Sequence, residues 1–76
     1  MINKIVNYIK DNNFKINYVN NSVNIVNYDK IIEIENTVIT ITKEDKIIFI
    51  KGSDLRLNKL LDNEVVITGT INKIEL

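Results

Sequence analysis

The side chains of this sequence that could perform acid–base chemistry are carboxylates, because the chain contains neither histidine nor cysteine. Glu33 and Glu35 lie two residues apart, which places both on one face of a strand. Carboxylate pairs of this kind carry out glycoside hydrolysis when they flank a sugar. Ser53 precedes Asp54, which combines a hydroxyl with a potential base. Solvated charge and turn formation explain both pairs better, so neither predicts a catalytic site.

Other kinds of functional site also lack their usual residues. The two glycines, Gly52 and Gly69, are isolated from each other, so there is no glycine-rich phosphate loop. A metal would have to be held by carboxylates alone. Ten basic residues balance ten acidic ones, without the basic stripe or aromatic platform of a nucleic-acid binder. The sequence therefore predicts a non-enzymatic protein with no cofactor, no metal and no nucleic-acid partner.

The length of the chain limits how stable a single copy can be. A domain of 76 residues buries only about 60% of its unfolded surface. Small domains compensate with disulfides, with a metal or by associating. Disulfides are impossible here and a metal is disfavoured, so self-association is the option that the composition leaves open.

The first segment has the spacing of a short amphipathic helix, predicted over residues 1–13. Ile2, Ile5, Val6 and Ile9 recur at helical intervals and form one apolar stripe. So short a helix needs a docking surface. It either covers one end of the core or contacts a partner or a membrane surface, which makes Ile2, Ile5 and Ile9 candidate interface residues. The segment lacks the continuous apolar run of a signal peptide, so a cytoplasmic location is expected.

From residue 14 to residue 76 the period changes to two, and turn signals recur every 8–12 residues or so. Asn20 begins a polar turn cluster, and Lys43–Lys46 is a polar connection between two β-rich runs, which favours a hairpin. No helix-length gap separates the strands, so a parallel arrangement is disfavoured. These features predict a mainly β domain: a single small antiparallel meander, either sandwich-like or solenoid-like, preceded by the short helix.

The run from Ile47 to Ile50 is apolar on both faces of a strand. Such a run is either a central strand or part of an interface, which makes Ile47 and Phe49 candidate interface residues. The chain contains no proline to protect its strand edges, and unprotected edges add strands from neighbours. Assembly with further copies or with a partner protein is therefore expected.

The two glycines stand in similar surroundings. Each follows an apolar strand, in Ile50–Gly52 and in Ile67–Gly69, and each precedes another apolar alternation. Glycine within a β pattern marks a bulge, a bend or a close approach of backbones. Gly52 and Gly69 are predicted to form bends, as Asn20 forms a turn. The alternative is that the glycines are equivalent corners of a short solenoid.

These segments resemble a known family. The stretch Ile48–Ile74 is similar to the C-terminal signature of the YabP/YqfC family of sporulation proteins, more closely its YqfC branch. In that signature an apolar strand ends in glycine, as at Gly52, and is echoed by Gly-x-Ile-x-x-Ile, as at Gly69. The segment Val23–Glu33 looks like the family's early strands and its Asn-Tyr turn. The chain departs from the family at Phe14, where proline is usual.

The resemblance implies a non-enzymatic structural or interaction module made in the mother-cell compartment of a sporulating bacterium. Such a protein takes part in forming the spore envelope, beside a membrane protein encoded with it. It is also expected to form homo-oligomers and to have no membrane span of its own. The alternative function is a small β-barrel that binds a regulatory partner, a ligand or nucleic acid.

Overall fold

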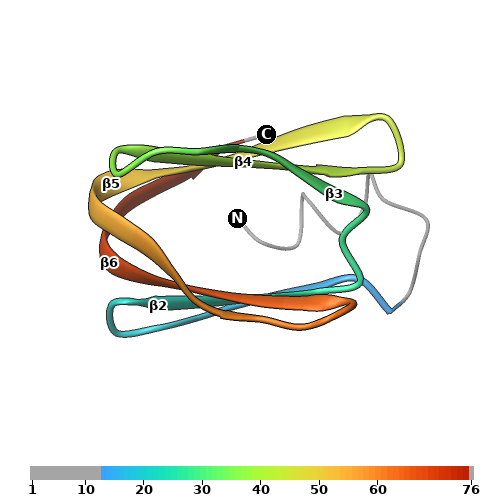
Figure 1. Ribbon diagram of the computed structural model, residues 1–76, viewed down its shortest axis with the longest axis horizontal. Helices are drawn as coiled ribbons and strands as arrows, with labels where there is room; N and C mark the ends of the chain where they lie inside the picture. The colour runs from blue at the N-terminus through green and yellow to red at the C-terminus, as the bar shows by residue number, and fades with distance from the viewer. Residues whose placement is uncertain (1–12, 76) are drawn as a thin grey trace.

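The computed structural model describes residues 13–75, and these form six antiparallel strands in one sheet (Figure 1). The strands are β1 (Lys15–Val19), β2 (Ser22–Val26), β3 (Lys30–Ile34), β4 (Val38–Lys43), β5 (Lys46–Leu60) and β6 (Glu64–Glu75). The prediction of a mainly β domain is confirmed. The predicted N-terminal helix, with Ile2, Ile5 and Ile9, lies outside the described residues.

The strand order is β1-β2-β6-β5-β4-β3, which is a meander only in part. Strands β3 to β6 follow one another as neighbours, but β2 pairs with β6 instead of β3. The reason is the connection after β2. Its Asn27 amide donates to the carbonyl of Asn63, and its Asp29 amide donates to the carbonyl of Thr42. The connection thus bonds to two distant parts of the sheet and carries the chain away from β2 before β3 begins.

The sheet is folded over into two layers (Figure 1). Strands β5 and β6, with 15 and 12 residues, are long enough to run through both layers. One layer contains β3, β4, the first half of β5 and the second half of β6. The other contains β1, β2, the first half of β6 and the second half of β5. Strands β1 and β3 end the sheet and are not paired with each other.

The core lies between the layers, and the period-two pattern predicted its residues. Directly paired residues share a face of the sheet, and the inner pairs are apolar, such as Ile39 with Ile50 and Val23 with Ile67. Both pairs are fully buried. The buried apolar side chains are Phe14, Ile16, Val23, Ile25, Ile39, Ile41, Ile48, Ile50, Leu55, Val65 and Ile67.

Gly52 and Gly69 lie on neighbouring strands at the corner where the sheet folds. A Cβ on Gly52 would lie 1.8 Å from the carbonyl oxygen of Thr70, and one on Gly69 would lie 2.5 Å from that of Asp54. Each glycine thus allows the backbone of the other strand to approach closely. Gly69 also has a φ of 131°, and Asp54 beside the corner has a φ of 54°. The pairing of β5 with β6 is antiparallel, so the solenoid alternative, which stacks parallel coils, is wrong.

Short polar residues form the turns. Asn20 has a φ of 55° between β1 and β2, a conformation that asparagine adopts more readily than most residues. The predicted hairpin at Lys43–Lys46 is confirmed, because these two residues pair at the ends of β4 and β5. Glu44 in that hairpin has a φ of 52°, which matches the primed turns that join two strands tightly.

Candidate functional site

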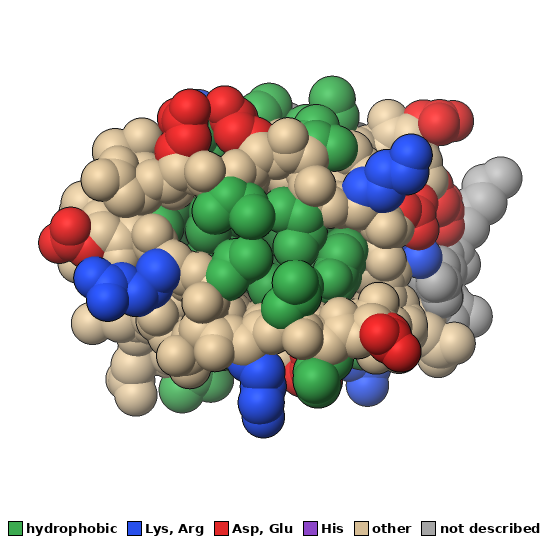
Figure 2. Space-filling model, viewed as in Figure 1, with side chains coloured by type: hydrophobic (Ala, Val, Ile, Leu, Met, Phe, Trp, Pro, Cys, Tyr) green, Lys and Arg blue, Asp and Glu red, His purple; other side chains and the backbone are tan. Residues whose placement is uncertain are grey.

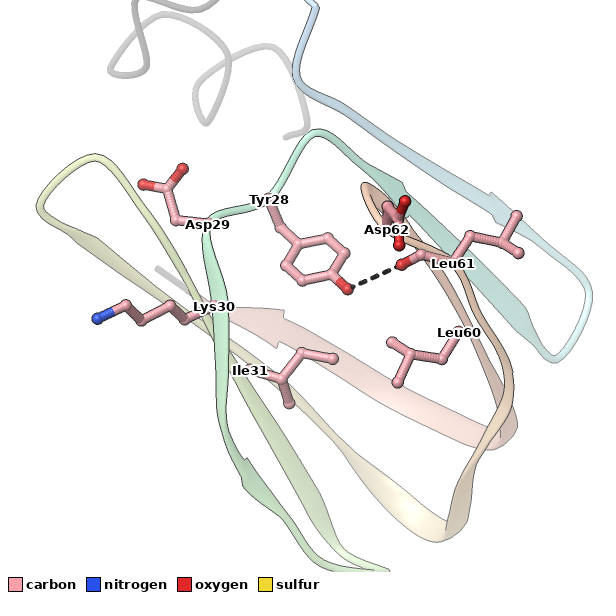
Figure 3. Close-up of a pocket in the computed structure, with 7 residues that line it drawn as sticks. All are labelled: Tyr28, Asp29, Lys30, Ile31, Leu60, Leu61 and Asp62. Carbon is pink, nitrogen blue, oxygen red and sulfur yellow. Dashed lines mark hydrogen bonds between the residues drawn. The ribbon is translucent and has the colours of Figure 1, made fainter.

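A groove opens at the point where β3 begins and β5 ends (Figure 3). Its volume is about 520 Å³, and it is open to solvent along one side. The groove is lined by residues from the β2–β3 connection, from β3, and from the end of β5 with the turn after it: Tyr28, Asp29, Lys30, Ile31, Leu60, Leu61 and Asp62. It therefore joins an edge of one layer to an edge of the other.

The middle of the groove is apolar and its rim is polar. In Figure 3 the ring of Tyr28 lies between the two sides, with Ile31 and Leu60 facing each other below it. The Tyr28 hydroxyl donates to the carbonyl of Leu61 at 3.5 Å, which is long for a hydrogen bond. No cluster of three or more potential metal ligands occurs within residues 13–75. The groove thus combines an apolar middle with a polar, charged rim.

Asp29 holds the rim in place. Its carboxylate accepts the Glu44 amide hydrogen at 2.7 Å and lies 3.5 Å from the buried ammonium of Lys43. These contacts attach the connection after β2 to the hairpin between β4 and β5. Hydrogen bonds to a charged group are stronger than neutral ones, so Asp29 positions the groove.

Replacing Asp29 by alanine is expected to lower the free energy of unfolding by about 1.5–3 kcal/mol, the range for hydrogen bonds to charged groups. The loss arises because the Glu44 amide and the Lys43 ammonium lose this acceptor. Urea denaturation followed by circular dichroism measures the change. Asp62→Ala removes an exposed carboxylate from the same groove and should change stability by less than about 0.5 kcal/mol. Equal effects of the two substitutions would contradict the role of Asp29.

Beside the groove, apolar side chains at the margins of the two layers are exposed, and we call this surface the apolar opening. In the view of Figure 2, hydrophobic side chains gather at the centre of this face and charged side chains surround them. Ile34 on β3 is 56% exposed and Leu60 on β5 is 58% exposed, although each is paired with a fully buried residue. Both side chains therefore belong to the core side of the sheet but lie at its unpaired margin.

The candidate interface residues Ile47 and Phe49 lie on the opposite, outer side of β5. They alternate with Ile48 and Ile50, which are buried in the core. Ile47 is exposed, whereas Phe49 is half-buried under the ammonium of Lys51, which lies 5.5 Å from the ring centre. This outer surface is separate from the opening between the layers.

The ion pairs next to Phe49 make the stability of the fold depend on pH. The pKa of Glu75 lies below its ordinary value of 4.5, because the ammonium groups of Lys51 and Lys73 donate hydrogen bonds to the carboxylate and attract its charge. The Lys51 contact is 2.7 Å and the Lys73 contact is 3.2 Å. A pKa that is lower in the folded chain stabilises the fold above the unfolded pKa, and this stabilisation is lost as pH falls through the folded value.

We therefore expect Lys51→Met to raise the pKa of Glu75 towards its ordinary value. The variant should be less stable than the wild type at neutral pH, and the part of this difference that comes from Glu75 should disappear once Glu75 is protonated in both. Titration of the Glu75 carboxyl carbon by NMR, with denaturation curves at each pH, measures both effects. Lys15→Met, which changes an exposed lysine on β1, is the matched control. An unchanged Glu75 titration in Lys51→Met would contradict the assignment.

The apolar opening was not predicted from the sequence. In the sequence, Ile31, Ile34 and Leu60 look like any other apolar residues of a strand, and only their place at the sheet margin makes them accessible. The consecutive Leu60 and Leu61 were the available signal. An alternating strand buries only one of two successive apolar residues, and here both are exposed.

Comparisons with known proteins identify no relative. No family model matches the chain, and no curated protein or solved structure matches it. Among residues 13–75 there is no helix long and apolar enough to cross a membrane.

Proposed function

We propose that this chain is a non-enzymatic assembly module of the YabP/YqfC type that acts in spore envelope formation. In this function it binds further copies or a co-encoded membrane protein through exposed β-surface, in the mother cell. The family assignment rests on the glycine-centred signature and on the strands that precede it. The assembly role rests on the apolar opening at the sheet margin.

That opening is the observation that carries the proposal. Exposed apolar side chains at an unpaired strand edge favour association, because a partner strand satisfies the backbone and covers the apolar surface together. Ile34 and Leu60 combine both properties, since each is more than half exposed and lies at such an edge. An assembly module uses this surface, whereas an isolated domain would leave it in water.

A fluorescent fusion expressed from the native locus tests the biological setting. The expected signal appears during sporulation, in the mother cell, and deletion of the coding sequence reduces the yield of heat-resistant spores. Complementation with the wild-type chain should restore the yield. Equal expression in growing cells combined with an unchanged spore yield would contradict the proposed function.

A further inference from the structure

Two strand edges border the apolar opening, one from each layer. The first is β3, which ends the sheet and pairs only with β4. The second is the segment Arg56–Leu60 of β5, whose described pairing is with β6 alone. In Figure 1, β3 runs towards the corner, whereas this part of β5 runs away from it. The two edges are thus antiparallel to each other, on opposite sides of one opening.

The inner sides of the two edges match. On β3, Ile31 and Ile34 are paired with the buried residues Ile41 and Ile39, so they belong to the inner face of the sheet. On β5, Leu57 and Leu60 are paired with the buried residues Ile67 and Val65, and are inner residues as well.

The outer sides carry opposite charges. Glu33 on β3 is paired with Thr40 and accepts its hydroxyl hydrogen at 3.0 Å, and Glu35 follows on the same edge. Arg56 and Lys59 on β5 are paired with Thr68 and Val66, which are outer positions. On the outer face the β3 edge thus carries Glu33 and Glu35 towards its end, with Lys30 at its start, and the β5 edge carries two cations. Apolar side chains lie on the inner face of both edges.

From this complementarity we infer that two copies of the chain associate across the opening as a symmetric dimer, with β3 of each copy added to Arg56–Leu60 of its partner. The two-fold axis is parallel to the strands, so both contacts are antiparallel and identical. The inference rests on the proposed assembly function and names a second copy as the partner.

The bulges in β3 and β5 lie where one antiparallel register can pair the two edges along their whole length. Ile32 is the extra residue between Ile31 and Glu33, and the register of β5 shifts between Leu57 and Lys59. Antiparallel pairing then sets Ile31 against Leu60 and Ile34 against Leu57 on the inner face. On the outer face it sets Glu33 against Lys59 and Glu35 against Arg56. Each layer of one copy continues into a layer of its partner, and the apolar opening is covered.

Charge reversal on each edge tests the dimer with substitutions of exposed side chains on the outer face. One variant carries Glu33→Lys and Glu35→Lys, and the other carries Arg56→Glu and Lys59→Glu. When two copies of the same variant associate, like charges face each other in both contacts. Opposite charges paired across strands stabilise an antiparallel contact and like charges destabilise it. Reversing two such pairs, each present twice, should therefore weaken the dimer about tenfold or more. Mixing the two variants restores opposite charges in both contacts, and should restore the dimer.

Light scattering and sedimentation at increasing concentration measure the mass, and circular dichroism checks that each variant is folded. The expected result is a wild-type dimer, two variants that dissociate more readily, and a heterodimer on mixing. A strictly monomeric wild type would overturn the inference, and so would a dimer that is indifferent to both variants. Neither outcome affects the sporulation phenotype of the deletion, so failure of the dimer and failure of the proposed function can be distinguished.

Discussion

Replacing Gly52 by valine is expected to prevent the sheet from folding over. Even the first carbon of the new side chain would lie 1.8 Å from the carbonyl oxygen of Thr70, which is far inside contact distance. That oxygen belongs to the backbone of β6, so relief requires the two central strands to separate. We expect a loss of about 3 kcal/mol or more, a large part of the roughly 4–11 kcal/mol typical of a domain this size. Thermal unfolding followed by circular dichroism measures it.

Two further variants determine whether the corner itself is responsible. Gly69→Val should be similarly destabilising, because its Cβ would lie 2.5 Å from the carbonyl oxygen of Asp54 and its φ of 131° disfavours any side chain. Ser53→Ala changes the exposed neighbour of Gly52 and should have an effect below about 0.5 kcal/mol. If both glycine variants melted with the wild type, the close approach of β5 and β6 at the corner would be disproved.

Replacing Ile48 by alanine is expected to cost about 2–5 kcal/mol, the range for truncating a buried isoleucine. Ile48 is fully buried, and it pairs with Ile41, which is also fully buried. The substitution leaves a cavity that a small two-layered core cannot fill by collapsing. Urea denaturation gives the difference in free energy of unfolding.

The adjacent residue is the matched control for this cavity. Ile47→Ala removes the same atoms from the outer face, where the side chain is 46% exposed, and should cost less than about 1 kcal/mol. Comparing the two losses shows which face of β5 is buried in the core. A larger loss for Ile47→Ala than for Ile48→Ala would mean that the faces of this strand are reversed.

The parts of the fold that local patterns determine could be predicted from the sequence. The alternation through Val23–Ile25 and Ile39–Ile41 identified core residues, because the side chains of a strand alternate between faces. The hairpin at Lys43–Lys46 follows from a polar connection between two apolar runs. For Ile47–Ile50, however, both faces are apolar, and only tertiary pairing decides which one enters the core.

The long-range arrangement could not be predicted in the same way. Pairing of β2 with β6 joins residues more than 40 positions apart, such as Val23 and Ile67, and no local pattern specifies it. The accessibility of Ile34 and Leu60 depends on this pairing, because it decides which strands become edges. The candidate site was missed for that reason, whereas the glycines that form the corner are visible in the sequence itself.

The central position of β6 has a consequence for how the protein is made. Strand β6 is the last of the six in chain order, yet it lies between β2 and β5. During synthesis the β1–β2 hairpin therefore emerges long before the strand that it pairs with, and β5 also waits for its second neighbour. High contact order slows folding and prolongs the exposure of unpaired β-surface. Strands β3, β4 and β5 can pair in turn as they emerge, but the β1–β2 hairpin joins them only after β6 has left the ribosome.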